Sequence, residues 1–160
     1  MTATVRRRQW NRYARLVEED QVALLFNTLG TPTNSAIQRY VNERKVPHLF
    51  ISAGADKFGD YKHFPWTMRF QPSFRTEAQI YAKYTLKEKP DAKIAILYQN
   101  DDLGKDYVAG VKDVLGDNFG KMVVTASYES TDPTVDSQIT SLGSGGANVL
   151  VVAATPKFAA

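Results

Sequence analysis

The sequence has no cysteine and only two histidines among its 160 residues. The absence of cysteine excludes disulfides, thiolate nucleophiles and thiolate metal sites, and it suits both cytoplasm and periplasm. His48 and His63 are too few to hold a metal without carboxylate partners, and no ligand spacing surrounds them. We therefore expect structural roles for both histidines and predict neither a metal site nor a cofactor.

Long apolar runs are also missing. No run approaches the ~18 residues of a membrane span, and the start lacks the ~7–15-residue apolar stretch of a secretory signal. The net charge of +3 comes from the arginines that precede any acidic residue, namely Arg6, Arg7, Arg8, Arg12 and Arg15. The rest of the chain has 15 basic and 17 acidic residues. Because no groove-reading motif is present, we interpret this start as a solvated helix face or an unstructured segment and predict no nucleic-acid partner.

What is present is a regular alternation of hydrophobic patterns, which is typical of β-α units in a parallel sheet. Helical spacing of apolar residues predicts helices around 10–17, 36–41, 74–86, 107–115 and 135–142. Short apolar runs predict strands at 22–26, 46–52, 93–98, 121–128 and 148–152. We expect Ala36 on the inner face of the second helix, and Asp132 or Thr134 as the cap of the last one.

The segment 65–72, PWTMRFQP, separates the two series of elements. A proline at each end favours an extended conformation, so we predict a crossing between two lobes. Trp66 and Phe70 would anchor this crossing by packing against the lobes. Two strands precede this segment and three follow it. Parallel sheets that small leave apolar edges unpaired, so we expect the chain to be part of a longer polypeptide.

The most informative stretch is 26–34, FNTLGTPTN. A strand leads into a turn rich in glycine and hydroxyl residues, and the turn opens onto a helix. In an open α/β sheet this junction lies at the carboxyl edge, where the first N–H groups of the helix can hold a small anion. The alternative is an ordinary turn with a helix N-cap at Thr33 or Asn34.

Catalysis finds little support in the sequence. Ser52 lacks the G-x-S-x-G frame, and no histidine belongs to a recognisable triad. The glycine-rich run 143–146 follows a helix and precedes a strand, so it predicts a helix C-cap rather than a phosphate loop. An alternative is a single flavodoxin-like or receiver-like domain that binds flavin or uses Asp101 and Asp102 for magnesium-dependent phosphotransfer. We favour an N-cap and a first-turn acid for these two residues.

Four motifs, which occur in order over residues 16–160, resemble a known family. They are LVEEDQVALLFNTLGTPTNSAIQRYVNERKVPHLFISAGA, HFPWTMRFQPSFRTEAQIYAKY, AKIAILYQNDDLGKDYVAGVKD and TDPTVDSQITSLGSGGANVLVVAATPKFAA. They are similar to the extracytoplasmic solute-binding proteins of ABC transporters, and within that group to the branched-chain amino acid receptors. The resemblance implies an α/β fold of the type I periplasmic binding proteins with parts of two Rossmann-like lobes. Residues 1–64 would form part of the first lobe, 65–72 a crossing, and 73–160 part of the second.

The resemblance also implies a ligand site in a cleft between the lobes. Its first loop, which would hold a ligand carboxylate, matches Leu29, Gly30, Thr31 and Thr33. Its second loop, which would receive the ligand amino group, matches Ser52, Ala53, Gly54, Ala55 and Asp56. Asp56 stands where the family usually has a small hydroxyl residue, so it either pairs with an ammonium or caps the loop and points to water.

The second lobe would contribute Leu103, where relatives often have an aromatic residue, together with Thr155 and Phe158. The implied function is non-enzymatic: a small amphipathic solute binds, and permease subunits of the transporter receive it. The family is periplasmic, although this chain shows no signal peptide. Micromolar affinity needs about 8.2 kcal/mol of binding free energy. We predict that the 160-residue chain alone binds branched-chain amino acids weakly or not at all.

Overall fold

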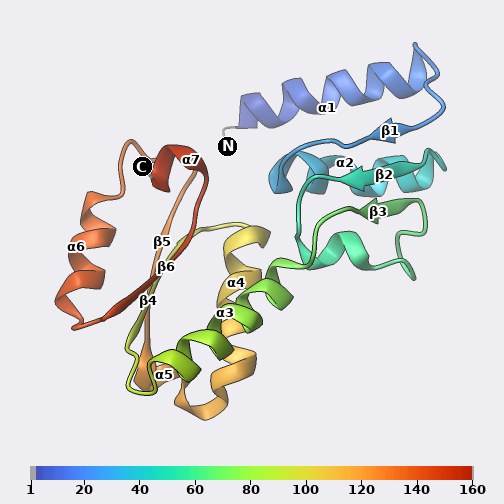
Figure 1. Cartoon of the computed structure of the whole chain (residues 1–160). Helices are drawn as coiled ribbons and strands as arrows, with labels where there is room; N and C mark the ends of the chain where they lie inside the picture. The colour runs from blue at the N-terminus through green and yellow to red at the C-terminus, as the bar shows by residue number, and fades with distance from the viewer. Residues whose placement is uncertain (1–2, 160) are drawn as a thin grey trace. The chain divides into compact units, whose positions relative to one another are not determined.

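The computed structural model describes the backbone of residues 3–159 and the side chains of residues 10–159 (Figure 1). The chain divides into two compact units, Met1–Ser73 and Phe74–Ala160, each with its own three-stranded sheet. The alternative of a single flavodoxin-like or receiver-like domain is therefore wrong. Among the described residues, no helix is both long enough and apolar enough to cross a membrane.

The first unit contains α1 (Ala3–Glu18), β1 (Leu25–Phe26), α2 (Thr31–Glu43), β2 (His48–Ile51), the 3-10 helix η1 (Asp56–Gly59) and β3 (Thr67–Arg69). Its strands are all parallel and lie in the order β1-β2-β3. The helix that we expected around 10–17 is confirmed, and the arginine side chains at positions 6 to 8 lie outside the described residues. The segment 65–72 is extended as we expected, and its centre also pairs with β2 as a third strand, whereas its role as a crossing stays a prediction.

The core of the first unit is partly polar. Leu25, Ile37 and Val41 form its buried apolar cluster. The expected inward position of Ala36 is wrong, since this residue is exposed. Its place on the buried face of α2 is taken by Asn34 and Gln38, both almost fully buried.

These two residues belong to a set at four-residue intervals, Asn34, Gln38 and Asn42, which we call the amide row. Each member bonds a different segment. Asn34 reaches the loop before α2, Gln38 donates to the carbonyl of Lys57, and Asn42 donates to the hydroxyl of Thr67. Residues four apart share one helix face, so the amide row joins α2 to three segments along a single line.

The first unit also carries an exposed aromatic row. Phe26 and Phe70, 62% and 67% exposed, both contact Phe50 edge-on, with ring centroids 5.5 and 6.2 Å apart. Phe50 has a φ of 54°, and the pairing of β2 with β3 shifts register between His48 and Ile51. This local twist is a bulge that places the three rings in contact.

The second unit contains α3 (Phe74–Glu88), β4 (Ile94–Gln99), α4 (Asp102–Leu115), η2 (Gly116–Asn118), α5 (Phe119–Met122), β5 (Val123–Tyr128), α6 (Asp136–Ser144), β6 (Val149–Ala153) and α7 (Pro156–Ala159). Its parallel strands lie in the order β5-β4-β6. The three helices and three strands that we expected here are confirmed to within about five residues at each end. The predicted caps of α6 are wrong, because Val135 is its N-cap and the Asp132 carboxylate accepts from the N–H of Glu129.

Helices cover both faces of the second sheet, with α3 and α4 on one side and α6 on the other (Figure 1). Ile94 and Ile96 face α3 and α4, whereas Ala95 and Leu97 face Leu142 of α6. This explains why β4 is nearly free of polar residues. The close approach of α3 to α4 requires Gly110, since a Cβ atom there would lie 2.3 Å from the carbonyl oxygen of Arg75.

Candidate functional site

The two candidate loops of the first unit lie side by side at the carboxyl edge of its sheet. Leu29 forms a parallel bridge with Ser52. The N–H of Ser52 donates to the Thr28 carbonyl at 3.0 Å, and the N–H of Gly30 donates to the Ser52 carbonyl at 3.4 Å. The structure therefore brings the expected carboxylate loop and the expected amino-group loop together.

The start of α2 has no side-chain cap. Thr33 and Asn34 are not N-caps, because the helix begins at Thr31 with Gly30 as the capping residue. Gly30 has a φ of 96°, a conformation that side chains rarely adopt. Thr31 and Thr33 are buried, and the Thr31 hydroxyl has no hydrogen-bond partner. Leu29, by contrast, is 74% exposed.

A buried polar cluster holds this loop. The amide Nδ2 of Asn34 donates to the carbonyls of Thr28 and Gly30 at 3.0 and 2.7 Å. The Thr28 hydroxyl donates to Oδ1 of Asn34 and lies 2.6 Å from Nε2 of His48. That hydroxyl therefore accepts from Nε2–H, which leaves the proton-free Nδ1 of His48 buried without a partner. Burial lowers the pKa of His48 from 6.5 to about 4, so the imidazole is neutral at pH 7.

The second loop is mostly enclosed. Ala53, Gly54 and Ala55 are buried, and Ser52 is half-buried. Asp56 has a cationic partner within its own unit. It is half-buried and forms an ion pair with Arg69 at 3.5 Å. Sequence reasoning missed Arg69, whose only signal was a cation at the end of a short segment between prolines.

In the second unit the carboxyl edge begins with Asp101, the N-cap of α4. Its Oδ1 accepts from the N–H groups of Leu103 and Gly104 at 3.0 and 3.3 Å. The expected capping role of Asp101 is confirmed, and Asp102 is the first-turn acid. Burial, the largest influence, raises the pKa of Asp101. Leu103 is half-buried beside this cap.

The other candidates of the second unit follow β6. The N–H of Thr155 donates to the hydroxyl of Tyr128 at 3.2 Å. Phe158 is only 6% exposed and packs on the Tyr128 ring with centroids 4.3 Å apart. Phe158 therefore packs in the core of this unit. Tyr128 was missed because sequence patterns assigned it only to a strand, and the buried Gln99 was missed because it follows the predicted strand 93–98.

The two helix starts differ in one respect that bears on binding. Both α2 and α4 follow a strand at a carboxyl edge. At α4 the carboxylate of Asp101 occupies the N-terminus, whereas Gly30 offers no side chain at α2. A helix N-terminus favours a negative charge, so the start of α2 can accept a carboxylate from outside the chain.

Reactive groups are sparse across the described residues. No three histidine or acidic side chains among them lie close enough together to hold a metal ion. His63 is exposed and bonds Asp60 at 2.7 Å, and His48 is buried in the cluster around Thr28. The arrangement described here can bind a polar solute through main-chain groups.

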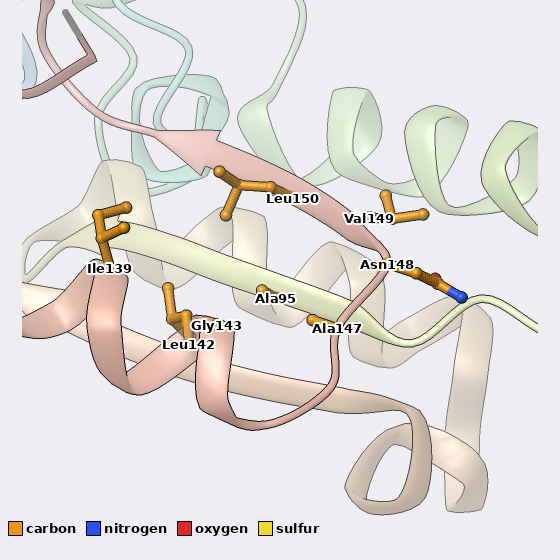
Figure 2. Close-up of a pocket in the computed structure, with 8 residues that line it drawn as sticks. All are labelled: Ala95, Ile139, Leu142, Gly143, Ala147, Asn148, Val149 and Leu150. Carbon is orange, nitrogen blue, oxygen red and sulfur yellow. The ribbon is translucent and has the colours of Figure 1, made fainter.

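A separate groove of about 280 Å³ lies between α6 and the strands β4 and β6. Figure 2 shows Leu142 and Leu150 on its walls and Ala95 on its floor. Its one polar side chain, Asn148, already accepts a bond from the N–H of Lys93 at 2.9 Å. The groove includes the start of β6, whereas Thr155 follows the end of that strand, so it is not the candidate solute site.

Comparisons with known proteins agree with this architecture. A family model described as "Periplasmic binding protein" matches residues 7–160. No curated protein sequence matches the chain. Among solved structures, a periplasmic binding protein from Burkholderia mallei is 18% identical with a TM-score of 0.80, covering 94% of this chain and 40% of that chain.

Two further structures show the same fold. A possible leucine/isoleucine/valine-binding protein from Rhodopirellula baltica SH 1 is 18% identical with a TM-score of 0.80, covering 94% of this chain and 42% of that chain. A solute binding protein of an ABC transporter from R. palustris, in complex with benzoate, is 15% identical with a TM-score of 0.77. The match covers 92% of this chain and 41% of that chain. The chain thus spans about two fifths of the length of these structures. Because the family model matches nearly the whole chain, the protein belongs to the periplasmic binding protein family.

Proposed function

We propose that this chain serves the solute-binding component of an ABC importer and binds a small amphipathic carboxylate. A branched-chain or related amino acid is the first candidate, and permease subunits of the transporter are the partners. The family is periplasmic, which is where such a component would meet its solute.

The observation that carries this proposal is the uncapped start of α2. The Asp101 carboxylate shows how a helix of this chain binds an acid, through two N–H groups at about 3 Å. At α2 the residue equivalent to Leu103 is Pro32, which has no N–H, so a solute carboxylate would accept from the N–H of Thr31 or Thr33 instead. It would also give the buried Thr31 hydroxyl a partner. Hydrogen bonds to a charged group contribute about 1.5–3 kcal/mol each.

The rest of the solute would meet main-chain groups and apolar side chains. Ser52, Ala53, Gly54 and Ala55 form the loop beside α2 and supply carbonyl groups for an ammonium. Exposed Leu29 supplies an apolar surface. Thr33, Asp56, Leu103, Thr155 and Phe158 complete the set that we propose for solute contact.

The similar structures support the class of solute. One is named as a possible leucine/isoleucine/valine-binding protein, and another holds benzoate. These compounds differ in size and in the presence of an ammonium, but each carries a carboxylate. We therefore assign the carboxylate as the recognised group and the binding as non-enzymatic.

The test uses three probes that separate the charged groups of leucine: L-leucine, 4-methylpentanoate without the ammonium, and 3-methylbutylamine without the carboxylate. Backbone amide shifts of the ¹⁵N-labelled chain are followed during each titration. We expect both acids to shift the amides of Leu29, Gly30 and Thr31, and the amine to leave them unchanged. Affinity should lie in the millimolar range, which corresponds to about 4 kcal/mol.

Thr31→Val is the matched variant, because it removes the hydroxyl and keeps the side-chain shape. We expect a several-fold weaker response to both acids without loss of thermal stability, since the unpartnered hydroxyl costs free energy in the absence of solute. Thr140→Val, at an exposed threonine that bonds its own helix, is the control. An equal response to the amine and the acids would refute carboxylate recognition, and micromolar affinity for leucine would overturn the predicted weakness.

A further inference from the structure

A line of hydrogen bonds crosses the carboxyl edge of the second sheet. Thr155, after β6, donates its N–H to the Tyr128 hydroxyl at 3.2 Å. Tyr128 ends β5, and its hydroxyl donates to Oε1 of Gln99 at 3.4 Å. Gln99 ends β4, and its Nε2 donates to Oδ2 of Asp101 at 2.5 Å. The line therefore joins the ends of all three strands to the start of α4.

The two central members are enclosed. Tyr128 is 2% and Gln99 5% exposed, and the two are direct partners across β4 and β5. The Tyr128 hydroxyl accepts one bond and donates another, so its orientation is fixed from both sides. Leaving any of these buried groups without a partner would cost more than the bond itself contributes. The line therefore has one favoured arrangement.

Each end of the line reaches a residue that we propose for solute contact. One end is the main chain of Thr155. At the other end, Oδ1 of Asp101 accepts from the N–H of Leu103 at 3.0 Å. Tyr128 and Gln99 lie between these two ends, so we expect their influence on binding to pass through Thr155 and Leu103.

We propose that Tyr128 and Gln99 are positioning residues that set the spacing between Thr155 and Leu103. A fixed spacing between a hydroxyl residue and an aliphatic one selects solutes by the distance between their polar and apolar parts. The importance of this spacing for binding rests on the proposed function. The spacing itself is a property of the second unit and can be measured without a solute.

Tyr128→Phe in the whole 160-residue chain tests this inference, because it removes one oxygen atom and keeps the ring packed on Phe158. We expect amide hydrogen exchange at both Thr155 and Leu103 to accelerate about 3–10-fold relative to the amide of Ile96 in the middle of β4. A merely structural loss would accelerate all three amides together. Tyr84→Phe, at a tyrosine 64% exposed on α3, is the matched control.

Titration with 4-methylpentanoate then separates the two proposals. If wild-type Leu103 and Thr155 respond, Tyr128→Phe should weaken their response several-fold while Tyr84→Phe leaves it unchanged. If they do not respond, the proposal that these two residues contact the solute is refuted. The exchange rates at Thr155 and Leu103 still test whether Tyr128 holds both residues in place.

Acceleration at Thr155 with no change at Leu103 would overturn the inference, because the effect would not travel along the line. If Tyr128→Phe prevents folding, Gln99→Met provides the second variant, since it removes both bonds of the amide and keeps a long apolar side chain. It should accelerate exchange at the same two amides, and an unchanged rate at both would contradict the proposal.

Discussion

The Thr28 hydroxyl lies 2.6 Å from Nε2 of His48, a side chain with no exposed surface. This contact ties the loop before α2 to the centre of the first sheet. It also makes that loop sensitive to the protonation state of one buried imidazole.

We expect the first unit to lose stability as the pH falls from 6.5 towards 4. In this window the unfolded chain protonates His48, while the folded chain, with its pKa lowered to about 4, does not. The free energy of unfolding should fall by at most about 3 kcal/mol, since one pKa unit corresponds to about 1.4 kcal/mol. Urea unfolding followed by tryptophan fluorescence measures this unit, because Trp10 and Trp66 both belong to it.

His48→Gln should flatten this pH dependence, because glutamine keeps an N–H donor for Thr28 and has no proton to gain. His63→Gln, at an exposed histidine, serves as the control. If the free energy of unfolding of His48→Gln depends on pH as strongly as that of the wild type, another group is responsible for the pH dependence.

Asn34→Ala should destabilise the first unit by about 2–4 kcal/mol, because the carbonyls of Thr28 and Gly30 each lose one of their donors and the Thr28 hydroxyl loses its acceptor. Urea unfolding monitored by tryptophan fluorescence gives the value. Asn11→Ala, at an exposed position on α1, should change stability by less than about 0.5 kcal/mol. Equal effects of the two substitutions would contradict the role of the cluster.

Gly110→Ala should destabilise the second unit by about 1–3 kcal/mol or more, since the added methyl group meets the backbone of Arg75 at 2.3 Å and pushes α3 away from α4. Gly143→Ala is the opposite case, because a Cβ atom there meets nothing within 4 Å. Within α6 it should stabilise by about 0.5–1 kcal/mol through helix propensity. Thermal unfolding followed by circular dichroism compares both variants, and a neutral Gly110→Ala would show that the helices can separate freely.

Asp56→Asn should alter stability by less than about 1 kcal/mol, because its ion pair with Arg69 is long and partly exposed. Since Arg69 already offsets the charge of Asp56, the variant should weaken the binding of L-leucine and the binding of 4-methylpentanoate to the same extent. Amide-shift titrations with both probes give the affinity of each, and hence the ratio of the two affinities before and after the substitution. Selective loss of leucine would mean that Asp56 does receive the ammonium.

The second unit was largely predictable because its elements are long and strongly periodic. The pattern of β4, buried on both faces, has few other interpretations. In the first unit, β1 pairs over only Leu25 and Phe26, and β3 is three residues long between two prolines. The apolar run 22–26 predicted β1 but made it too long, and the three residues of β3 were too few for a strand pattern.

The amide row was not predicted because hydrophobicity assigns Asn34 and Gln38 to the surface. Their burial depends on carbonyl groups brought near by the fold, which no local pattern encodes. The contact of Phe158 with Tyr128 was not predicted for a related reason, since it joins residues far apart in the chain. The glycine turn before α2 was found because its conformation is encoded locally.

The contact between Phe26, Phe50 and Phe70 affects a common laboratory assay. Fluorescent dyes that detect molten or misfolded states do so by adsorbing to exposed hydrophobic surface. The native first unit already displays such a surface, so the dye should emit before any denaturant is added. For this protein, emission of that kind does not distinguish a folded sample from a damaged one.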